Sequence, residues 1–312
     1  MRLITYLKDG QSRTGFLIHK QVVDLIDAVQ FWRKNQLSNT RIYITNEFAL
    51  FDWMDVLFAG ESAWKMIREI HDYFASGEKH LTLKSVQKYE EVVLLPPIQR
   101  PGKIICVGMN YPPSAREGKG SKPPYPILFH KVATSLIGHL NPVVIPYICN
   151  RVEYEGELTV VIGKRGKNIP RELASDWIAG YTIANDIGAG DIQRRSSQWT
   201  SGKMFDTFCP LGPALVSSDE VPTPDNLRIR TQLNDEIVQE ATTAEMYFSI
   251  AELVSYISTL TTLEPGDIIL TGSPKSVGGR PDPRHPLKPR DTICVEIEKL
   301  GVLTNPIIAE EL

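Results

Sequence analysis

Three acidic side chains near the middle of the sequence have the types and spacing of a chemical site. Glu155 and Glu157 stand two residues apart and directly precede an apolar run that starts at Leu158. Residues two apart on a β-strand point to the same face, which predicts that these carboxylates lie side by side. Like charges this close repel each other unless a cation or a proton lies between them. A hard divalent cation removes the conflict, since Mg²⁺, Mn²⁺ and Ca²⁺ all bind carboxylate oxygens.

A third carboxylate, Asp186, follows about 30 residues later, where another apolar run ends. A neighbouring strand that ended at this point would bring Asp186 beside the two glutamates. Each feature also has a plainer interpretation, because a Glu-x-Glu pair often decorates a solvent-facing strand and an aspartate after a strand often forms a turn or an N-cap. Taken together, the three acids predict a metal site in which Glu155, Glu157 and Asp186 are the ligands.

Strands must hold these acids in place, and the surrounding sequence is typical of strands. Residues 103–108, 158–163, 267–272 and 292–297 are short apolar runs rich in β-branched side chains, and each is followed by Gly, Pro or a charged pair. Apolar residues recur at helical spacing only in a few places, of which 61–74 and 250–260 are the clearest. The predicted fold class is therefore mainly β with some α, an α+β protein.

A double proline, Pro96-Pro97, marks the predicted domain boundary, because proline continues neither a helix nor a central strand. Residues 1–95 are expected to form a small α+β N-terminal domain, and residues 96–312 a larger, mostly β domain that carries the acids. A chain of 312 residues suits this division, since single hydrophobic cores stop growing at about 250 to 300 residues.

Composition excludes several other classes of protein. A net charge of -3 without a dense Lys/Arg block predicts no nucleic-acid partner. No apolar run approaches the roughly 20 residues of a membrane span, and the N-terminus lacks the apolar core of a signal peptide. The four cysteines are scattered without a Cys-x-x-Cys pair, which argues against a zinc cluster or a disulfide scaffold. We expect a soluble, cytoplasmic protein with reduced thiols and no membrane partner.

Six motifs, in order from about residue 103 to residue 305, resemble those of the fumarylacetoacetate hydrolase family. They are Val107-Gly108-Met109-Asn110-Tyr111, Phe129-His130-Lys131, Glu155-Gly156-Glu157-Leu158, Asn185-Asp186, Gly202-Lys203-Met204-Phe205-Asp206 and the run from Leu263 through Pro265-Gly266-Asp267 to Thr271-Gly272-Ser273-Pro274. The resemblance implies a β-roll-like C-terminal domain and a homodimer. It also implies that Mg²⁺ or Mn²⁺ binds to the two glutamates and the aspartate, with Ca²⁺ as a further candidate.

The reaction implied by this resemblance is enolate chemistry on a small keto or enol acid. The metal would bind the oxygens of a 2-keto acid or a 1,3-dicarbonyl acid and act as a Lewis acid toward the carbanion or enolate that forms. Members of the family hydrolyse C–C bonds, decarboxylate oxaloacetate, or isomerise and tautomerise keto and enol acids. Hydrolysis of a C–C bond, or a related enolate reaction, is the expected activity.

Individual roles are also implied by the motifs. Lys203 matches the family's active-site lysine and would stabilise negative charge on a substrate oxygen; its plainer interpretation is a solvated loop residue. Four other residues match positions that bind substrate, and Thr271 among them would hydrogen-bond the substrate carboxylate. These predicted substrate-binding residues are Gln193, Thr271, Lys131 and Tyr111.

The loop after Tyr111 departs from the family pattern. Hydrolytic members place a histidine there with a glutamate three residues later, and here Glu117 is present but Ser114 stands in place of the histidine. A serine hydroxyl is a poor general base at neutral pH, so activation of water is weakened unless His130 or His139 takes over. Ser114 and Glu117 are kept as catalytic candidates. The alternatives are a decarboxylase or keto–enol isomerase that needs no activated water, or a member that binds an acid without catalysis.

A second departure lies after Asp186. Many members have Ser-Ala-Arg-Asp at this point, whereas Gly190 replaces the arginine in this chain. A clamp for a substrate carboxylate is lost unless Arg194, Arg195 or Arg116 supplies it. We hypothesise from these two departures that the substrate is unusual, bulkier and less anionic.

Overall fold

The computed structural model describes residues 1–36, 52–76, 86–112, 121–274 and 286–311. Strands predominate within these ranges and helices are fewer, which confirms the predicted α+β class. Two catalytic candidates, Ser114 and Glu117, lie outside the described residues, as does Arg116. Their roles stay predictions.

One large sheet runs through the described part of the chain. Its strands are β1 (Arg2–Lys8), β2 (Gln11–Ile18), β3 (Gln21–Asp24), β4 (Gln87–Lys88), β5 (Val93–Leu95), β6 (Ile104–Gly108), β7 (Ile127–Lys131), β8 (Leu136–Ile137), β11 (Gly156–Ile162), β12 (Ile178–Asn185), β14 (Cys209–Ser217) and β17 (Ile268–Leu270). The order along the sheet is β4-β3-β2-β1-β14-β12-β11-β17-β6-β7, with β5 added to β1 and β8 to β14. The strands that carry the acids, β11 and β12, are therefore central.

A smaller sheet packs against one face of the large one. Its strands are β9 (Val143–Ile145), β15 (Arg228–Leu233), β16 (Glu236–Thr242), β18 (Thr292–Ile297) and β19 (Gly301–Ala309), in the order β16-β15-β18-β19-β9. Val160 and Ile183 from the large sheet share a buried core with Ile229 and Val295 from the small one. Two short strands, β10 (Val152–Glu153) and β13 (Gly188–Ala189), pair beside the acids. Because both of its faces are covered, β11 is buried along its whole length.

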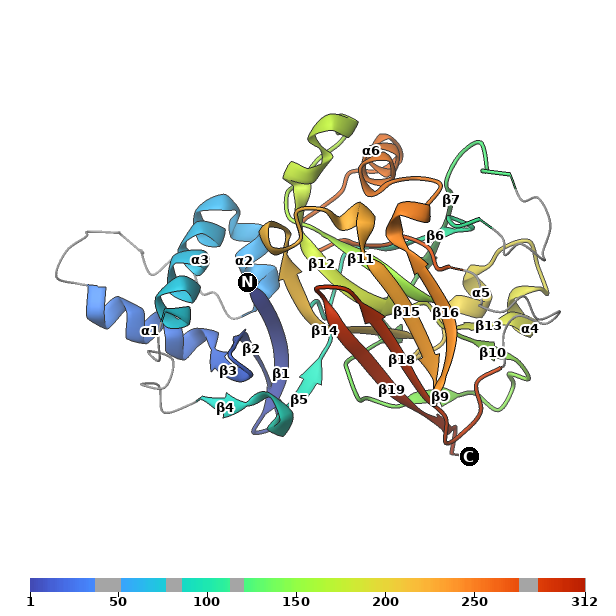
Figure 1. Cartoon of the computed structure of the whole chain (residues 1–312), viewed down its shortest axis with the longest axis horizontal. Helices are drawn as coiled ribbons and strands as arrows, with labels where there is room; N and C mark the ends of the chain where they lie inside the picture. Colours follow the sequence, from blue (N-terminus) through green and yellow to red (C-terminus); the bar gives the residue numbers. More distant parts are fainter. Residues whose placement is uncertain (37–51, 77–85, 113–120, 275–285, 312) are drawn as a thin grey trace.

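The helices gather at the two ends of the molecule and on one side (Figure 1). Their bounds are α1 (Leu25–Gln36), α2 (Trp53–Ala59), α3 (Glu61–Ala75), α4 (Gly190–Gln193), α5 (Thr200–Lys203) and α6 (Ile250–Leu260). The two helices predicted from apolar spacing, α3 and α6, are confirmed. Ser249 and Glu252 form a capping box that satisfies backbone donors at the start of α6.

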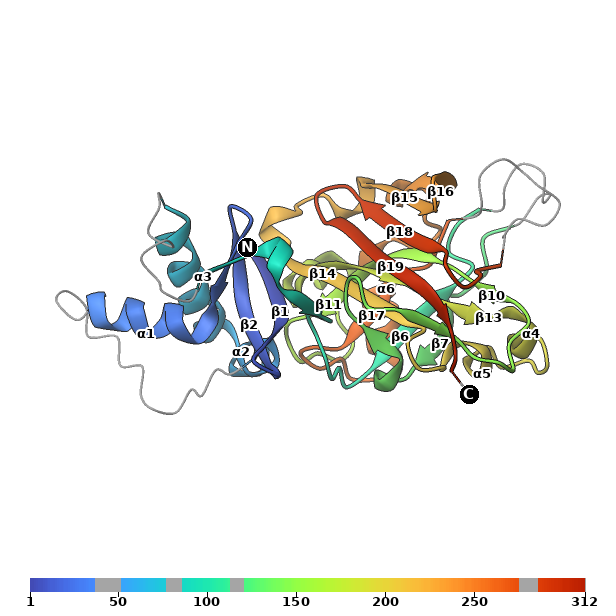
Figure 2. The same ribbon diagram turned by 90° about the horizontal axis from the view of Figure 1, so that it is seen from below.

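The N-terminal part of the chain joins the rest through both a sheet and a core. Helices α1 and α3 lie beyond β2 at one end of the molecule in both views (Figures 1 and 2), whereas β1 pairs directly with β14 through Leu3 and Leu215. Phe16 and Ile67 belong to the same buried cluster as Leu215. The predicted division into domains at residues 95 and 96 stays a prediction, because sheet and core continue across it.

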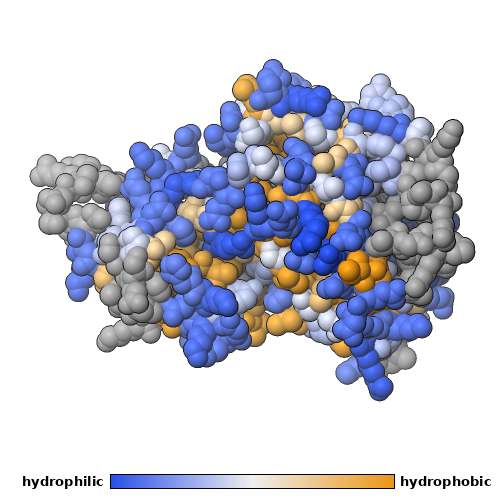
Figure 3. All heavy atoms as spheres, in the orientation of Figure 1, coloured by the Kyte–Doolittle hydropathy of each residue, from blue (hydrophilic) through white to orange (hydrophobic). Residues whose placement is uncertain are grey.

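The distribution of apolar side chains on the surface and the free cysteines are typical of an ordinary folded protein. On the face seen in Figure 3, apolar side chains are scattered among hydrophilic ones. None of the helices in the described ranges combines the length and the apolar character needed to cross a bilayer. All four cysteines are free, as the sequence predicts.

One buried carboxylate fixes the start of α1 on the large sheet. Asp24 is fully buried and accepts hydrogen bonds from Tyr6 Oη at 2.8 Å and from Arg13 Nε and Nη2 at 2.9 and 2.7 Å. It also accepts the backbone N–H groups of Ile26 and Asp27 at 3.0 and 3.1 Å, which caps the helix. Burial alone would raise the pKa of Asp24, but the hydrogen bonds from Arg13 and Tyr6 outweigh it and lower the pKa.

Replacing Asp24 by Asn should lower the free energy of unfolding at neutral pH by about 2 kcal/mol, because charged hydrogen bonds are lost. The pKa of Asp24 is lowered in the folded state, so its stabilisation is present above the ordinary pKa of 3.8 and is lost as the pH falls through the folded value. Urea unfolding of both proteins at neutral pH and in acid measures this, and the difference should shrink in acid. Equal stability at neutral pH would contradict the assignment.

Candidate metal centre

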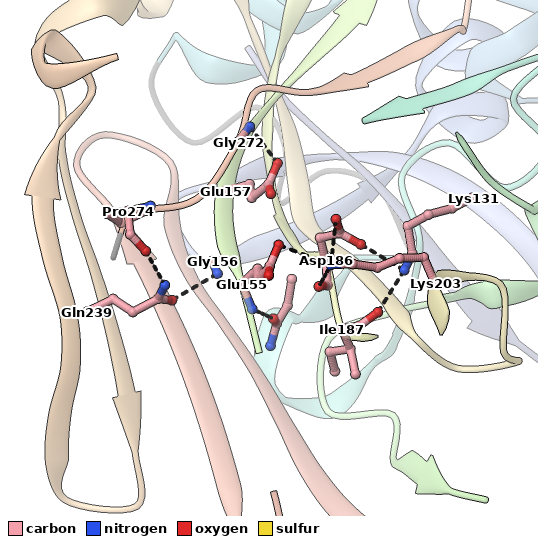
Figure 4. A network of polar contacts seen from close by, with 11 residues as sticks. Lys131, Glu155, Gly156, Glu157, Asp186, Ile187, Lys203, Gln239, Gly272 and Pro274 are labelled. Carbon is pink, nitrogen blue, oxygen red and sulfur yellow. Dashed lines mark hydrogen bonds and ion pairs between the residues drawn. The ribbon is translucent and has the colours of Figure 1, made fainter. Parts of the chain in front are cut away.

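Glu155, Glu157 and Asp186 meet at the ends of two paired strands (Figure 4). In the antiparallel pair β11–β12, Gly156 lies opposite Asn185, so the residues just beyond them are also neighbours. The N–H of Asp186 donates to the carbonyl oxygen of Glu155 at 2.7 Å. One carboxylate oxygen from each acid lies within 4.8 Å of the others. The predicted convergence of the three acids is confirmed, while their role as metal ligands stays a prediction.

Backbone and amide groups hold the two glutamates in this arrangement. The Asn185 side chain accepts the N–H of Glu155 at 2.9 Å, and the N–H of Gly272 donates to Glu157 Oε2 at 2.7 Å. Gly272 has a φ of 99°, and a Cβ there would lie 2.7 Å from the Cβ of Asn110. Only glycine suits that position. The Thr-Gly-Ser-Pro turn therefore aims a backbone donor at Glu157.

Two buried lysines lie against the carboxylates. Lys131 Nζ lies 2.8 Å from Asp186 Oδ1 and donates to the carbonyl oxygen of Ile187 at 2.9 Å. Lys203 Nζ lies 3.0 Å from both Asp186 Oδ2 and Glu155 Oε2, and donates to the carbonyl oxygen of Asp186 at 2.9 Å. Three carboxylates thus face two ammonium groups in a region largely closed to water. Among the residues that the structure describes, one negative charge is left without a positive partner.

The excess negative charge raises the pKa values of the buried groups around it. Burial, followed by the charges of Asp186 and Glu155, holds the pKa of Glu157 well above its usual range. Burial would lower the pKa of Lys203, but Asp186 and Glu155 raise it by more, so this lysine stays protonated. The cluster therefore favours a bound proton or a further cation.

The donor set fits a hard divalent cation. Both oxygens of Asp186 are fully buried, yet within the described part of the chain neither accepts a hydrogen bond. Lys131 and Lys203 lie 2.8 and 3.0 Å from these oxygens, and each carboxylate oxygen has a second lone pair for coordination. Buried carboxylate oxygens with unused lone pairs are the ligands that Mg²⁺ and Mn²⁺ prefer.

A cleft of about 420 Å³ opens beside the cluster, and several of the predicted residues line it. Glu155 and Lys203 reach it from the cluster, and Gln193 lines it from α4. Tyr111 also lines it, and its buried hydroxyl has no hydrogen-bond partner among the described residues. Burial, and then the charge of Glu157, raises the pKa of Tyr111, so the hydroxyl stays neutral.

Other candidates lie away from the cleft. Lys131 is buried behind Asp186, and the Thr271 hydroxyl donates to the carbonyl oxygen of Leu158 at 2.8 Å. Neither side chain is among those that line the cleft. His130 Nδ1 faces the carbonyl oxygen of Ile104, and His139 Nδ1 accepts the N–H of Thr304. Lys131 and Thr271 are placed to position the cluster, and their contact with substrate stays a prediction.

Several lining residues were not among the candidates from the sequence. Phe129 and Trp199 pack edge to face with ring centroids 5.6 Å apart, and a Cβ on Gly108 would lie 2.2 Å from the Trp199 ring. Lys203 Nζ lies 5.6 Å from the centroid of the Phe129 ring, and the Lys203 side chain is buried. Arg151 and Glu153 also line the cleft and form an ion pair. The signal for Glu153 was available, since it stands two residues before Glu155 on the same face.

Comparison with known proteins identifies the family. Residues 103–308 match the family model for the C-terminal part of fumarylacetoacetate (FAA) hydrolase. The chain belongs to this family of enzymes, as its motifs predict.

Individual relatives cover much of the chain. The mitochondrial oxaloacetate tautomerase fahd2 of Xenopus laevis is 42% identical over 256 residues, which span 81% of this chain and 77% of the relative. The 5-carboxymethyl-2-hydroxymuconate delta-isomerase of Mycobacterium smegmatis is 38% identical with a TM-score of 0.65, covering 73% of this chain and 86% of that one. Maleylpyruvate hydrolase from Sphingobium sp. SYK-6, solved with manganese(II) and pyruvate, is 26% identical with a TM-score of 0.75 over both full lengths.

Mn²⁺ and Mg²⁺ should bind the native protein, and Asp186→Asn should weaken binding by more than roughly 100-fold. Loss of a ligand should exceed the 10- to 100-fold cost typical of second-sphere partners. Calorimetric titration after chelator treatment measures this, with Asp235→Asn on the surface as the matched control. Equal affinity in the native and Asp186→Asn proteins would rule the cluster out as the metal centre.

Proposed function

We propose that this protein is a divalent-metal-dependent keto–enol tautomerase or isomerase that acts on a small 2-keto acid. The observation that carries the proposal is the carboxylate cluster at the wall of the cleft, next to a lysine that stays protonated. Such a site stabilises an enolate without needing an activated water. Similarity to two proteins, an oxaloacetate tautomerase and a delta-isomerase, supports this type of reaction.

Different residues of the site would bind the metal and stabilise the developing negative charge. Glu155, Glu157 and Asp186 would hold Mg²⁺ or Mn²⁺, which when bound supplies a Lewis acid for the oxygens of a keto acid. Lys203 brings a fixed positive charge to the oxygen on which negative charge develops, and its cover by Phe129 increases the strength of that interaction.

Orientation and proton transfer fall to other side chains. Gln193 offers an amide, and Tyr111 a neutral hydroxyl, for hydrogen bonds that fix the substrate in the cleft. The raised pKa of Lys203 makes it a poor base, so the proton that moves between carbon and oxygen needs another acceptor. Glu117 is the proposed acceptor, on the sequence pattern alone.

Hydrolysis of a C–C bond is the second candidate. It is favoured by the similarity to maleylpyruvate hydrolase. It requires a base that activates water, and no histidine lines the cleft within the described part of the chain. Ser114 replaces the loop histidine in sequence, so the proposal ranks hydrolysis below tautomerisation.

The remaining expectations also stand as proposals. We propose a homodimer, as the family resemblance implies. A cytoplasmic location rests on sequence alone, and the named relative from Xenopus laevis is mitochondrial.

Enol oxaloacetate should be converted to its keto form by the native protein with Mg²⁺ or Mn²⁺, and a chelator should abolish this. Lys203→Met should lower kcat by about 100- to 1000-fold, as expected for the loss of one group that stabilises an oxyanion. The decay of enol absorbance measures both, with Lys299→Met as the surface control.

Two further measurements separate the alternatives. Calorimetry with Mn²⁺ and a thermal unfolding curve test whether the Lys203→Met variant is folded and binds the metal. Glu155→Gln should lose turnover together with Mn²⁺ affinity. Acylpyruvate hydrolysis that outpaces tautomerisation would favour the hydrolase, and binding of keto acids without turnover would favour a non-catalytic member.

A further inference from the structure

A second cavity, with a volume of about 280 Å³, lies between α3 and the large sheet. On α3 it is lined by Glu61, Trp64 and Arg68, which share one face of the helix because they are three and four residues apart. On the sheet it is lined by residues just after β11, at the start of β12 and just after β14. No described residue lines both this space and the cleft beside the metal centre. We call this space the α3 cavity.

The α3 cavity lies at the far ends of the two strands that carry the acids. Glu157 stands near the start of β11, whereas Gly163, just after the end of β11, lines the cavity. The extended segment from Glu157 to Gly163 spans roughly 20 Å. A small molecule in the α3 cavity therefore does not reach the carboxylate cluster.

Ion pairs at both ends of the cavity show how α3 crosses the strands. Glu61 Oε2 lies 3.9 Å from Lys164 Nζ, just beyond β11, whereas Arg68 pairs with Asp219, just beyond β14. The helix rises about 10 Å between Glu61 and Arg68. Two steps between neighbouring strands, from β11 through β12 to β14, also span about 10 Å. The cavity is therefore an elongated slot with an ion pair at each end.

The middle of the slot is apolar. Trp64 is partly buried against the main core and lines the slot from α3. Val56 and Leu57 of α2 and Ile178 and Ala179 of β12 supply the other apolar walls. The volume of about 280 Å³ is close to the lower limit of small-molecule sites, roughly 300 Å³. One aromatic ring with short substituents suits this space, because it can pack against the indole of Trp64.

The end of the slot near the start of α3 is rich in carboxylates. The N–H of Gly163 donates to the carbonyl oxygen of Trp177 at 2.7 Å, and this continuation of the β11–β12 pairing brings Lys164 beside Asp176. Glu61 lies at the same end, 3.9 Å from Lys164. The carboxylates of Glu61 and Asp176 outnumber the ammonium group of Lys164. This end therefore favours a ligand group that donates a hydrogen bond.

The other end of the slot carries a guanidinium. Arg68 and Ser218 are its polar lining residues. Arg68 pairs with Asp219 through Nη1, and the two side chains are 36% and 47% exposed. A guanidinium has five N–H donors, which is more than one carboxylate accepts. Further donors of Arg68 and the hydroxyl of Ser218 therefore suit a carboxylate on a bound molecule.

We propose that the α3 cavity binds a small aromatic acid that carries a hydroxyl group on the opposite side of its ring. The ring lies beside Trp64, the carboxylate lies at Arg68, and the hydroxyl donates to Glu61 or Asp176. This order matches the acidic, apolar and basic parts of the slot. The site is separate from the metal centre and does not depend on the proposed function.

Calorimetry with 4-hydroxycinnamate and with its amide, 4-hydroxycinnamamide, tests the proposal. The two probes share the ring and the hydroxyl, and only the acid is anionic. The native protein should bind the acid about 10-fold more tightly, the lower end of the range for a hydrogen bond to a charged group, because Arg68 is partly exposed. Chelator treatment and Glu155→Gln should leave the affinity for the acid unchanged, since the slot lies far from the cluster.

Variants of the slot and matched controls make the result specific. Arg68→Gln should remove the preference for the acid, whereas Arg171→Gln, which also removes an arginine paired with a carboxylate, should not. Trp64→Ala should weaken both probes by about 10-fold through loss of the ring contact. Phe58→Ala removes an exposed aromatic ring of α2 that does not line the slot, and it should weaken neither. Ser175→Trp places a bulky ring at the exposed rim and should block both probes.

Three results would overturn the proposal. The first is the absence of saturable binding of 4-hydroxycinnamate to the native protein. The second is binding that is lost on chelation or in Glu155→Gln, which would place the acid at the metal centre instead. The third is binding that a folded Ser175→Trp variant retains, or a preference for the acid that Arg68→Gln retains. Thermal unfolding curves test whether each variant is folded, and the bound acid should raise the Tm of the native protein.

Discussion

Three carboxylates enclosed within 4.8 Å of one another are the interaction on which the rest of this structure depends. Like charges brought together away from water raise the free energy of the folded state, and nearby positive charges and hydrogen bonds offset this increase. Lys131 and Lys203 supply the charge, and Gly272 and Asn185 supply fixed donors and acceptors. Central strands covered on both faces give these groups a rigid, dry framework.

The two lysines have different roles although both contact Asp186. Lys131 comes from β7, is enclosed on all sides, and ties Asp186 to the turn that follows β12. Lys203 comes from the end of α5 and reaches the cleft beneath Phe129 and Trp199. One lysine thus keeps the cluster in place and the other turns its charge toward a bound molecule. The aromatic cover makes this second charge more effective, because fewer waters screen it.

The spacing of residues within short segments predicted helices and the direction of nearby side chains. Periodicity located α3 and α6, and the alternation of Glu155 and Glu157 predicted their shared face. Contacts that depend on register between distant segments could not be predicted in this way. The neighbourhood of Arg151 and Gly190 follows from the β10–β13 pairing, and the contact of Lys131 with Asp186 follows from the face of the large sheet on which its side chain lies. A motif identified Lys131 as important without indicating that it is enclosed.

The place of β1 in the large sheet has a consequence for biosynthesis. β1 pairs with β14, so residues near position 3 need partners near position 215. A ribosome makes the chain from its N-terminus, so β5 can cover Thr5 to Leu7 on this edge well before β14 is made, whereas Arg2 and Leu3 wait for partners more than 200 residues further along. Open strand edges invite association with other chains. Arg2 and Leu3 are therefore the last part of β1 to gain a partner as the chain is made.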